Sequence, residues 1–409
     1  MTGGRVFYVA PDPVAALGSR LAVLAASDAG LAADPDRLTV VPGGGRAGRS
    51  LLELPEVGWR LQREAAAVVL WTGSAAARRR LAELGIPNAN SDPQVARRLE
   101  NKAHFQDAAR AWGIPVPRSV SGVAGPDLLP SASHFGRAVF QLARGYSGAA
   151  TYPVRDAADL DELITRFAGH PCRVAEFVEG TPVTVTGVAL EERVALGPPC
   201  LQLTGIAELT PYPLGSCGND FSSPVLGAEA VAQVAQQTGE WLRELGHRGI
   251  FGVDLVVDGR GRPWCIEVNP RLVASLPLWS LSATAGGSLL DLHLAAFGLA
   301  EDTGASLDCH WSQLILYQQG RLASAEAAAS QEGNWEPGRG FVPERRLTLA
   351  GPGPGRVGLI RRSPAGPGKE IARLILEGPL IRADGHLLPH LRTAVLSLRR
   401  ELEPGPARP

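Results

Sequence analysis

Two acids and an asparagine in neighbouring apolar segments of this 409-residue chain could bind a divalent cation. Glu267 and Asn269 are two residues apart, so they share one face if their segment is a strand. The turn Asp258–Gly261 would bring Asp254 opposite or diagonal to Glu267, roughly 5–8 Å away. Two carboxylates and an amide oxygen form the hard oxygen set that Mg²⁺ prefers, often shared with substrate phosphates. The alternative is a solvated hairpin face, which the cost of burying an unpartnered acid disfavours.

Cations and glycines elsewhere could handle phosphate or carboxylate groups. Arg271 directly follows the metal-ligand pattern, and its planar guanidinium can grip a carboxylate; a structural ion pair is the alternative. Lys102 lies early in an expected helix and could reach a phosphate, although it could equally be a surface lysine. Residues 144–148 (Arg-Gly-Tyr-Ser-Gly) can expose backbone N–H groups because glycine lets the chain approach an anion closely. Their alternative is a plain hairpin turn.

The first part of the chain must form an element pattern that positions these residues. Strand patterns at 6–10, 38–41 and 66–71 alternate with helical patterns at 14–26 and 75–84. This alternation predicts an open parallel sheet wrapped by helices. A single helix is expected from 92 to 112, ending at Gly113 before prolines that mark a first domain boundary.

An α+β organisation is expected for the rest of the chain. We expect strands at 138–142, 151–154, 173–177 and 183–190, a hairpin at 250–257 and 263–268, and helices at 156–167, 228–245 and 288–297. Residues 205–224 are expected to be a long functional loop or a hairpin with an irregular tip. The substrate candidates are Asn219, Asp220, Ser222, Arg271 and Ser275. Blocks of Pro and Gly between short strands after residue 310 predict a small appended domain.

Composition excludes several classes of protein. The net charge of −1 argues against a protein that coats nucleic acid or an anionic membrane. The sequence contains no run of 18 apolar residues, the length needed to span a bilayer. Five scattered cysteines and no signal-peptide pattern favour a reducing cytoplasm. His386 and His390 have zinc-like spacing, but Pro389 is expected to interrupt the helix that would align them.

The order of these motifs resembles the ATP-grasp superfamily. The resemblance rests on Gly252-Val253-Asp254, Glu267-Val268-Asn269-Pro270-Arg271, Asn101–Phe105 with Gly113–Pro117, the strand and Gly-rich loop of 138–152, the hinge 176–180, and Thr284-Ala285-Gly286. It implies a mixed α/β and α+β ATP-grasp fold. The implied parts are an N-terminal Rossmann-like parallel-sheet domain (1–115), a lid with the Gly-rich loop (116–182), an ATP- and metal-binding subdomain (183–309) and the appended domain (310–409).

The resemblance also implies roles for individual residues. Asp254, Glu267 and Asn269 would hold one or two Mg²⁺, or Mn²⁺, that bridge the phosphates of ATP. Phosphate would be bound by Lys102, Gln141, Arg144, Gly145, Ser147 and Gly148, and adenosine by Glu176, Val178 and Glu179. Arg271 and Arg144 are the expected catalytic cations. The implied activity is an ATP-dependent carboxylate–amine ligase acting through an acyl phosphate, on an amino acid or small peptide. A homodimer, with a dimer surface on the appended domain, is a further expectation.

Two positions depart from the family pattern. Gln141 stands where the strand before the Gly-rich loop normally ends in a phosphate-binding lysine, and we expect Arg144 to supply the charge. Pro182 stands where the family often has a ribose-binding Glu, which Glu179 would replace. Alternatives are therefore a phosphotransferase of the same fold or a catalytically inactive nucleotide-binding regulatory or scaffold protein. An unrelated oxidoreductase is disfavoured because Gly-x-Gly-x-x-Gly does not follow the first strand.

Overall fold

The computed structural model describes most of the chain. The described residues are 4–41, 51–128, 132–145, 148–283, 287–304, 306–322, 329–336, 340–362 and 366–403. Two motifs singled out in the sequence lie partly or wholly outside them: Tyr146 and Ser147 of the Gly-rich loop, and Thr284–Gly286. The three consecutive glycines at 43–45 and the residues 404–409 are outside them as well.

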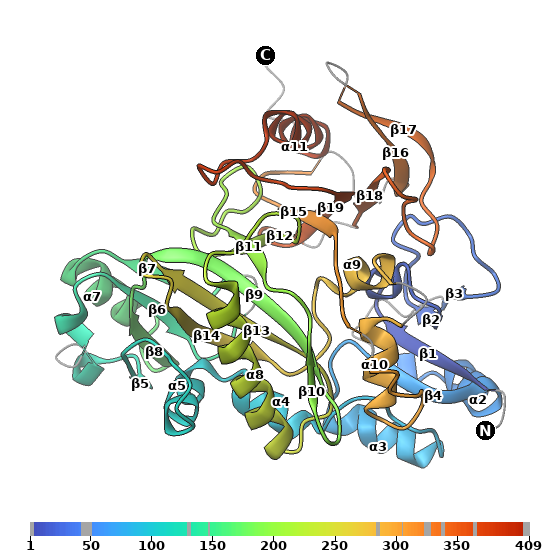
Figure 1. The fold of residues 1–409 in the computed structure, drawn as a ribbon, viewed down its shortest axis with the longest axis horizontal. Coiled ribbons are helices and arrows are strands. Elements are labelled where there is room, and N and C mark those ends of the chain that lie inside the picture. Colours follow the sequence, from blue (N-terminus) through green and yellow to red (C-terminus); the bar gives the residue numbers. More distant parts are fainter. Residues whose placement is uncertain are drawn as a thin grey trace.

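The N-terminal part is a small parallel sheet, as predicted. Its strands are β1 (Arg5–Ala10), β2 (Ala22–Ala25), β3 (Leu38–Val40) and β4 (Ala65–Leu70), in the order β3-β2-β1-β4. Helices α2 (Pro55–Glu64) and α3 (Ala75–Glu83) accompany it, at the lower right in Figure 1. The helix predicted at 14–26 is wrong, because only a 3-10 turn, η1 (Val14–Ala16), forms before β2. Pairing of the apolar run 22–25 with two strands overrides its helical pattern.

The helix predicted at 92–112 is two helices, α4 (Pro93–Leu99) and α5 (Lys102–Ala111). Asn101 causes the break: its side chain accepts a hydrogen bond from the N–H of Ala103 and so caps α5. Lys102 consequently lies in the first turn of a new helix rather than in the middle of a long one.

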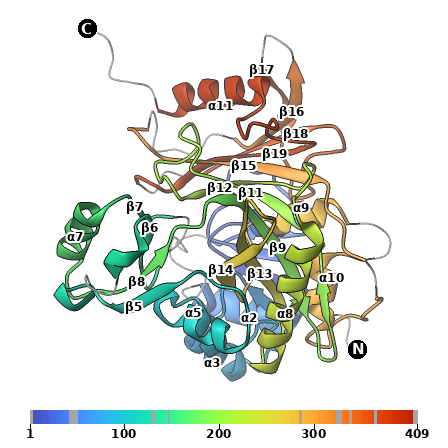
Figure 2. The same ribbon diagram turned by 60° about the vertical axis from the view of Figure 1, so that its left-hand side comes forward.

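The lid is a four-stranded antiparallel sheet, ordered β5-β8-β6-β7. Its elements are β5 (Ser119–Val123), η2 (Pro126–Leu128), η3 (Ser133–Phe135), β6 (Ala138–Leu142), β7 (Thr151–Val154), α7 (Ala157–Arg166) and β8 (Pro171–Glu176). Phe140 is fully buried in the small core beneath α7. The lid stands to one side of the central strands in Figures 1 and 2.

The largest element is an eleven-stranded sheet. Its strands are β9 (Gly180–Ala189), β10 (Val194–Leu196), β11 (Cys200–Thr204), β12 (Ser216–Asp220), β13 (Gly249–Asp258), β14 (Pro263–Asn269), β15 (Trp311–Tyr317), β16 (Gln331–Glu336), β17 (Gly340–Arg346), β18 (Val357–Arg361) and β19 (Glu370–Glu377). The segment expected to be a loop or hairpin is the hairpin β11–β12. Because β12 pairs with β15, the sheet runs on across residue 310; the four-part division of the chain stays a prediction.

Helices cover this sheet at several places. They are α8 (Ala228–Glu244), α9 (Leu276–Leu281), α10 (Leu289–Ala295) and α11 (Pro389–Leu402). The sequence predicted α8 and α10 but not the short α9 or α11. Pro389 opens α11, because a first helical residue does not need the N–H that proline lacks, and His386 therefore lies outside the helix that contains His390, as expected. The described residues contain no cluster of three or more His, Cys, Asp or Glu side chains suited to a metal.

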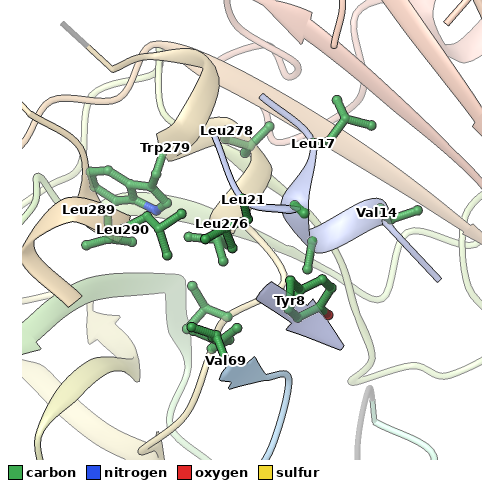
Figure 3. Packing of buried hydrophobic residues seen from close by; sticks show 14 of the residues in the cluster. Tyr8, Val14, Leu17, Leu21, Val69, Leu276, Leu278, Trp279, Leu289 and Leu290 are labelled. Atoms are coloured by element: carbon green, nitrogen blue, oxygen red, sulfur yellow. The ribbon is translucent and has the colours of Figure 1, made fainter. Parts of the chain in front are cut away.

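One apolar cluster joins the N-terminal sheet to the rest of the molecule. Figure 3 shows Tyr8, Leu17 and Val69 close to residues of α9 and α10, including Trp279. The same cluster reaches β18 and β19 through Ile360 and Ile375. The N-terminal sheet and the late strands are therefore held on a common core. Within the described ranges, no helix is long and apolar enough to cross a membrane.

Candidate functional site

A cavity of about 480 Å³ opens between the lid, α5 and the central strands. This volume lies in the range of small-molecule sites. β6 and β8 of the lid, the ribbon β13–β14, and strands β9, β11, β12 and β15 all contribute to its wall. The site is thus assembled from segments on both sides of residue 310.

The three predicted metal ligands converge in this cavity. Asp254 pairs with Glu267 across β13 and β14, as the spacing predicted. Asn269, two residues beyond Glu267, donates its amide to Oδ2 of Asp254 at 3.1 Å. Gln202 of β11 donates to Oδ1 of the same carboxylate at 2.9 Å. Asp254 is therefore held by amide groups and not by a cation.

The surroundings of Asp254 disfavour the charged form of its carboxyl group. Burial is the main cause that raises its pKa to about 6, and the nearby negative charge of Glu267 raises it further. A hydrogen bond with Thr184 and the charges of Arg271 and Lys102 partly offset this rise. A divalent cation shared by Asp254 and Glu267 would relieve both the burial cost and the mutual repulsion.

Lys102 reaches the same centre from the start of α5. Its Nζ lies 2.8 Å from Oε2 of Glu267, and the lysine side chain is only 6% exposed. The same nitrogen donates to the carbonyl of Gly145 in the Gly-rich loop at 3.4 Å. The capped helix start therefore places a buried ammonium between a metal-ligand candidate and the loop.

Arg271 is in direct contact with one of the metal-ligand candidates. It donates to Oε1 of Glu100 at 2.7 Å and to Oδ1 of Asn269 at 2.9 Å. Its guanidinium carbon is 5.8 Å from the ring centroid of Trp71. Arg271 therefore forms a structural ion pair with Glu100 and also lines the cavity, so the two alternatives left by the sequence occur together.

Gln141 is buried in the cavity wall with a cation beside it. It faces Arg173 across β6 and β8, and Arg173 donates to Oε1 of Gln141 from Nε, at 3.1 Å, and from Nη2. Nε2 of Gln141 donates to Thr151 at 3.2 Å. Among the described residues, Arg173 is therefore the cation nearest to Gln141, which stands where the family pattern has a lysine.

The Gly-rich loop brings glycines, but not Arg144, to the cavity. Gly145 and Gly148 line it, whereas Arg144 is exposed and donates to the carbonyl of Arg97 at 3.3 Å. Gly148 has a φ of +79°, and a Cβ there would come within 2.3 Å of the Cα of Gly215. A side chain at 148 would therefore collide with the β11–β12 hairpin. The role of Arg144 stays a prediction.

Two residues of the predicted hinge lie in the cavity wall, and their role in binding adenine stays a prediction. Glu176 and Val178 line the cavity, and the carboxylate of Glu176 is held by the backbone N–H and Nε of Arg118 at 2.9 and 2.7 Å. Glu179 points to solvent, with its side chain 85% exposed and 3.3 Å from Arg137. Glu179 does not line the cavity, so its ribose-binding role stays a prediction without support from this geometry.

The substrate candidates divide into two groups. Asn219 and Ser275 line the cavity, and Asn219 accepts a hydrogen bond from Gln313 at 2.8 Å. Asp220 is fully buried outside the cavity, where it accepts from the backbone of Ser222 at 3.0 Å and of Leu380 at 2.7 Å. These contacts give Asp220 and Ser222 a structural task in joining β12 to the segment after β19.

Several lining residues were missed by reasoning from the sequence. They are Trp71, Gln106, Arg173, Thr184, Gln202, Ile315 and Tyr317. The position of Gln106 could have been predicted, because Gln106 is four residues from Lys102 and hence on the same face of α5. Arg173 also carried a signal, as an arginine between apolar neighbours in a predicted strand. The residues of β15 could not be placed without knowing that β15 pairs with β12.

The donor set fits a hard divalent cation. Asp254 and Glu267 supply carboxylates from paired positions, and Asn269 supplies an amide oxygen. Oxygen ligands of this kind suit Mg²⁺ or Mn²⁺ and not a soft metal. Two protein carboxylates leave coordination positions for phosphate oxygens, which is the usual arrangement for Mg²⁺ with a nucleotide.

Comparison with known proteins agrees with this geometry. Residues 100–275 match the family model of the ATP-grasp domain. Carbamoyl phosphate synthase large chain of Vibrio cholerae is 24% identical over 208 residues, which are 49% of this chain and 19% of that protein. The chain therefore spans about a fifth of the length of this curated relative.

Two solved structures illustrate the shared fold. Carboxyaminoimidazole ribonucleotide synthase of Aspergillus clavatus, complexed with ATP, has a TM-score of 0.64 at 14% identity, covering 98% of this chain and 100% of that one. Phosphoribosylamine–glycine ligase of Thermotoga maritima has a TM-score of 0.63 at 14% identity, covering 98% and 97%. Residues 100–275 thus match the ATP-grasp domain, and the chain shares its fold with these solved structures.

Proposed function

We propose that this chain is an ATP-dependent carboxylate–amine ligase. The observation that carries the proposal is the convergence of Asp254, Glu267 and Asn269 with the cations Lys102 and Arg271 in one cavity. In the proposed reaction, an oxygen of a substrate carboxylate attacks the γ-phosphorus of ATP. The bond between that phosphorus and the β,γ-bridging oxygen breaks, ADP leaves, and an acyl phosphate remains. An amine then attacks the acyl carbon, phosphate leaves, and the amine loses a proton as the amide forms.

The chain's own residues would act mainly by positioning and by neutralising charge. One or two Mg²⁺, or Mn²⁺, held by Asp254, Glu267 and Asn269 would offset the charge of the triphosphate. Lys102 would exchange its contact with Glu267 for a phosphate oxygen. Arg271 lies next to Asn269 and would orient the carboxylate as it attacks and then becomes an acyl phosphate.

The walls of the cavity would protect the intermediate. Gly145 and Gly148 place the Gly-rich loop over the Lys102 side, and the β11–β12 hairpin touches the loop at Gly215. Exclusion of water matters because hydrolysis of an acyl phosphate wastes ATP. Asn219 and Ser275 also line the cavity and are suited to bind a polar substrate, and we propose an amino acid or small peptide.

The test is a screen for ADP release with the twenty amino acids and simple organic acids, each offered as carboxylate donor and as amine acceptor with MgATP. We expect ADP release that requires both substrates, together with an amide in the mass spectrum of the product. Hydroxylamine should trap the acyl phosphate when the carboxylate alone is present.

Other outcomes would replace the proposal. ADP release with phosphate retained on a hydroxyl group, and no hydroxamate, would identify a phosphotransferase. Binding of ATP without ADP release across the whole panel would identify a nucleotide-binding regulatory or scaffold protein. A cytoplasmic location and assembly as a homodimer belong to the same proposal, and are checked by fractionation and by light scattering.

A further inference from the structure

Arg173 is a buried cation without a carboxylate partner in the described part of the chain. Its residue is 1% exposed and lies in the wall of the cavity. Nε and Nη2 are used by the amide oxygen of Gln141, which carries no net charge. Nη1 is shielded from solvent and has no hydrogen-bond partner among the described residues. The side chain is thus held firmly but is not neutralised.

The neighbouring cations differ from Arg173 in this respect. Lys102 pairs with Glu267 at 2.8 Å, and Arg271 pairs with Glu100 at 2.7 Å. Glu267 is close enough to favour the charged form of Arg173, yet burial is the stronger influence and lowers the pKa of Arg173 to about 10. The guanidinium therefore stays protonated at neutral pH while its charge lacks a direct partner.

Such an arrangement is costly for stability alone. A buried charge without a counterion is less favourable than an apolar side chain of similar size, and a buried N–H without an acceptor adds to that cost. A bound anion in the cavity would remove both costs, because it would supply charge and acceptor oxygens together. The anion that the proposed function brings next to Glu267 and Lys102 is a nucleotide phosphate.

We propose that Arg173, oriented by Gln141, binds a phosphate group of the nucleotide and thereby supplies the positive charge that the strand end at position 141 lacks. This inference rests on the proposed function for the identity of the anion. Arg173 is then a nucleotide-binding residue, and Gln141 is a positioning residue that acts through it. Opposite positions on paired strands allow this exchange, because the Cβ atoms of directly opposite residues lie only about 4.5–5.5 Å apart and a long side chain from either strand can reach the same group.

The first test measures binding of MgADP and of adenosine by calorimetry. Arg173→Met should weaken MgADP binding at least tenfold and leave adenosine binding within twofold, because only ADP carries phosphate. Arg155→Met is the matched control: this exposed lid arginine pairs with Asp159, and its variant should bind both ligands as the wild type does.

The second test separates binding from folding. Urea unfolding without nucleotide should show Arg173→Met to be at least as stable as the wild type, since the substitution removes an unneutralised buried charge. A lysine at position 141 should supply the charge that Arg173→Met removes. The double variant Gln141→Lys, Arg173→Met should therefore recover most of the lost MgADP affinity. If Arg173→Met does not fold, Arg173→Lys serves in its place, with the charge kept and the two contacts to Gln141 weakened; it should bind MgADP several-fold less tightly.

The outcomes distinguish the inference from the function on which it rests. A wild-type protein that binds no adenine nucleotide removes the proposed function itself. A wild type that binds MgADP, with Arg173→Met binding it equally well, overturns only the assignment of Arg173. Equal weakening of MgADP and adenosine, or weakening by Arg144→Met in place of Arg173→Met, overturns it as well.

Discussion

Nζ of Lys102 and Oε2 of Glu267 lie 2.8 Å apart, so a phosphate-binding candidate and a metal-ligand candidate form an ion pair with each other. Glu267 is also the cross-strand neighbour of Asp254. Any cation that enters between the two carboxylates competes with Lys102, and any phosphate that approaches Lys102 competes with Glu267. We therefore expect metal and nucleotide binding to be coupled through this contact.

The coupling predicts how Lys102→Met and Glu267→Gln combine. In nucleotide-free protein, a double-mutant cycle on the free energy of unfolding should give a coupling of about 1–2 kcal/mol, because the pair is only partly screened by solvent. With saturating MgADP the coupling should fall towards zero, since each side chain has exchanged its partner. Urea unfolding of the four proteins checks this. A coupling that MgADP leaves unchanged would mean that the pair persists in the complex.

The metal assignment predicts a difference between acids on the same β-ribbon. Asp254→Asn and Glu267→Gln should each reduce turnover at least a hundredfold, about 2.7 kcal/mol, because the charge that offsets the metal is lost. Asp258→Asn is the control, since Asp258 lies at the turn and holds Arg262 and Trp264 outside the cavity. Steady-state assays at several Mg²⁺ concentrations measure the effect. Equal loss in all three variants would point to damage of the ribbon and not to loss of a metal.

The contact between the Gly-rich loop and the β11–β12 hairpin predicts an effect of Gly148→Ala. The φ of +79° and the 2.3 Å approach to Gly215 leave no room for a methyl group, so the loop must shift. We expect the KM for ATP to rise several-fold. Gly136→Ala is matched in the positive sign of φ, at +66°, but has open space around it, and should cost roughly 1–3 kcal/mol of stability with KM unchanged. An unchanged KM in Gly148→Ala would show that closure does not need this contact.

Two buried histidines predict how stability depends on pH. Burial lowers the pKa of His247 and of His293 to about 4, below the value near 6.5 of an unfolded chain. Between these values the unfolded state binds more protons, so stability falls as the pH drops from 6.5 to 4. Each histidine should contribute up to about 1.4 kcal/mol per pH unit.

His293→Gln isolates one of these contributions. Nδ1 of His293 accepts from the N–H of Ile250 at 3.0 Å, and Nε2 lies 2.9 Å from the carbonyl of Ala89. Both contacts are made together only by a neutral ring that is protonated at Nε2. Unfolding curves at pH 6.5 and 4.5 should show a smaller pH dependence in the variant than in the wild type. An identical pH dependence would mean that His293 does not titrate over this range.

The sequence allowed the ribbon β13–β14, which carries the metal-ligand candidates, to be predicted because its signals are local. A period of two, a four-residue turn and apolar neighbours together set the pairing of Asp254 with Glu267. The parallel N-terminal sheet followed from alternating patterns in the same way. The division of 92–112 by Asn101 was also local, and the Asn-Lys dipeptide there is an N-cap signal that an unbroken helical pattern outweighed.

Long-range pairing explains what could not be predicted. Arg173 reaches Gln141 only because β8 inserts between β5 and β6, which no local pattern specifies. The same holds for Ile315 and Tyr317, which reach the cavity through the pairing of β15 with β12. Residues 22–25 read as part of a helix because the strands that flank them come from elsewhere in the chain.

The most direct test of the account is a crystal structure with Mn²⁺ and a non-hydrolysable ATP analogue, using the anomalous signal of the metal. We predict a peak roughly 2.0–2.3 Å from carboxylate oxygens of Asp254 and Glu267 and from Oδ1 of Asn269, shared with phosphate oxygens, with Lys102 moved from Glu267 to a phosphate. A nucleotide bound elsewhere, with no metal peak and Lys102 still on Glu267, would contradict the account.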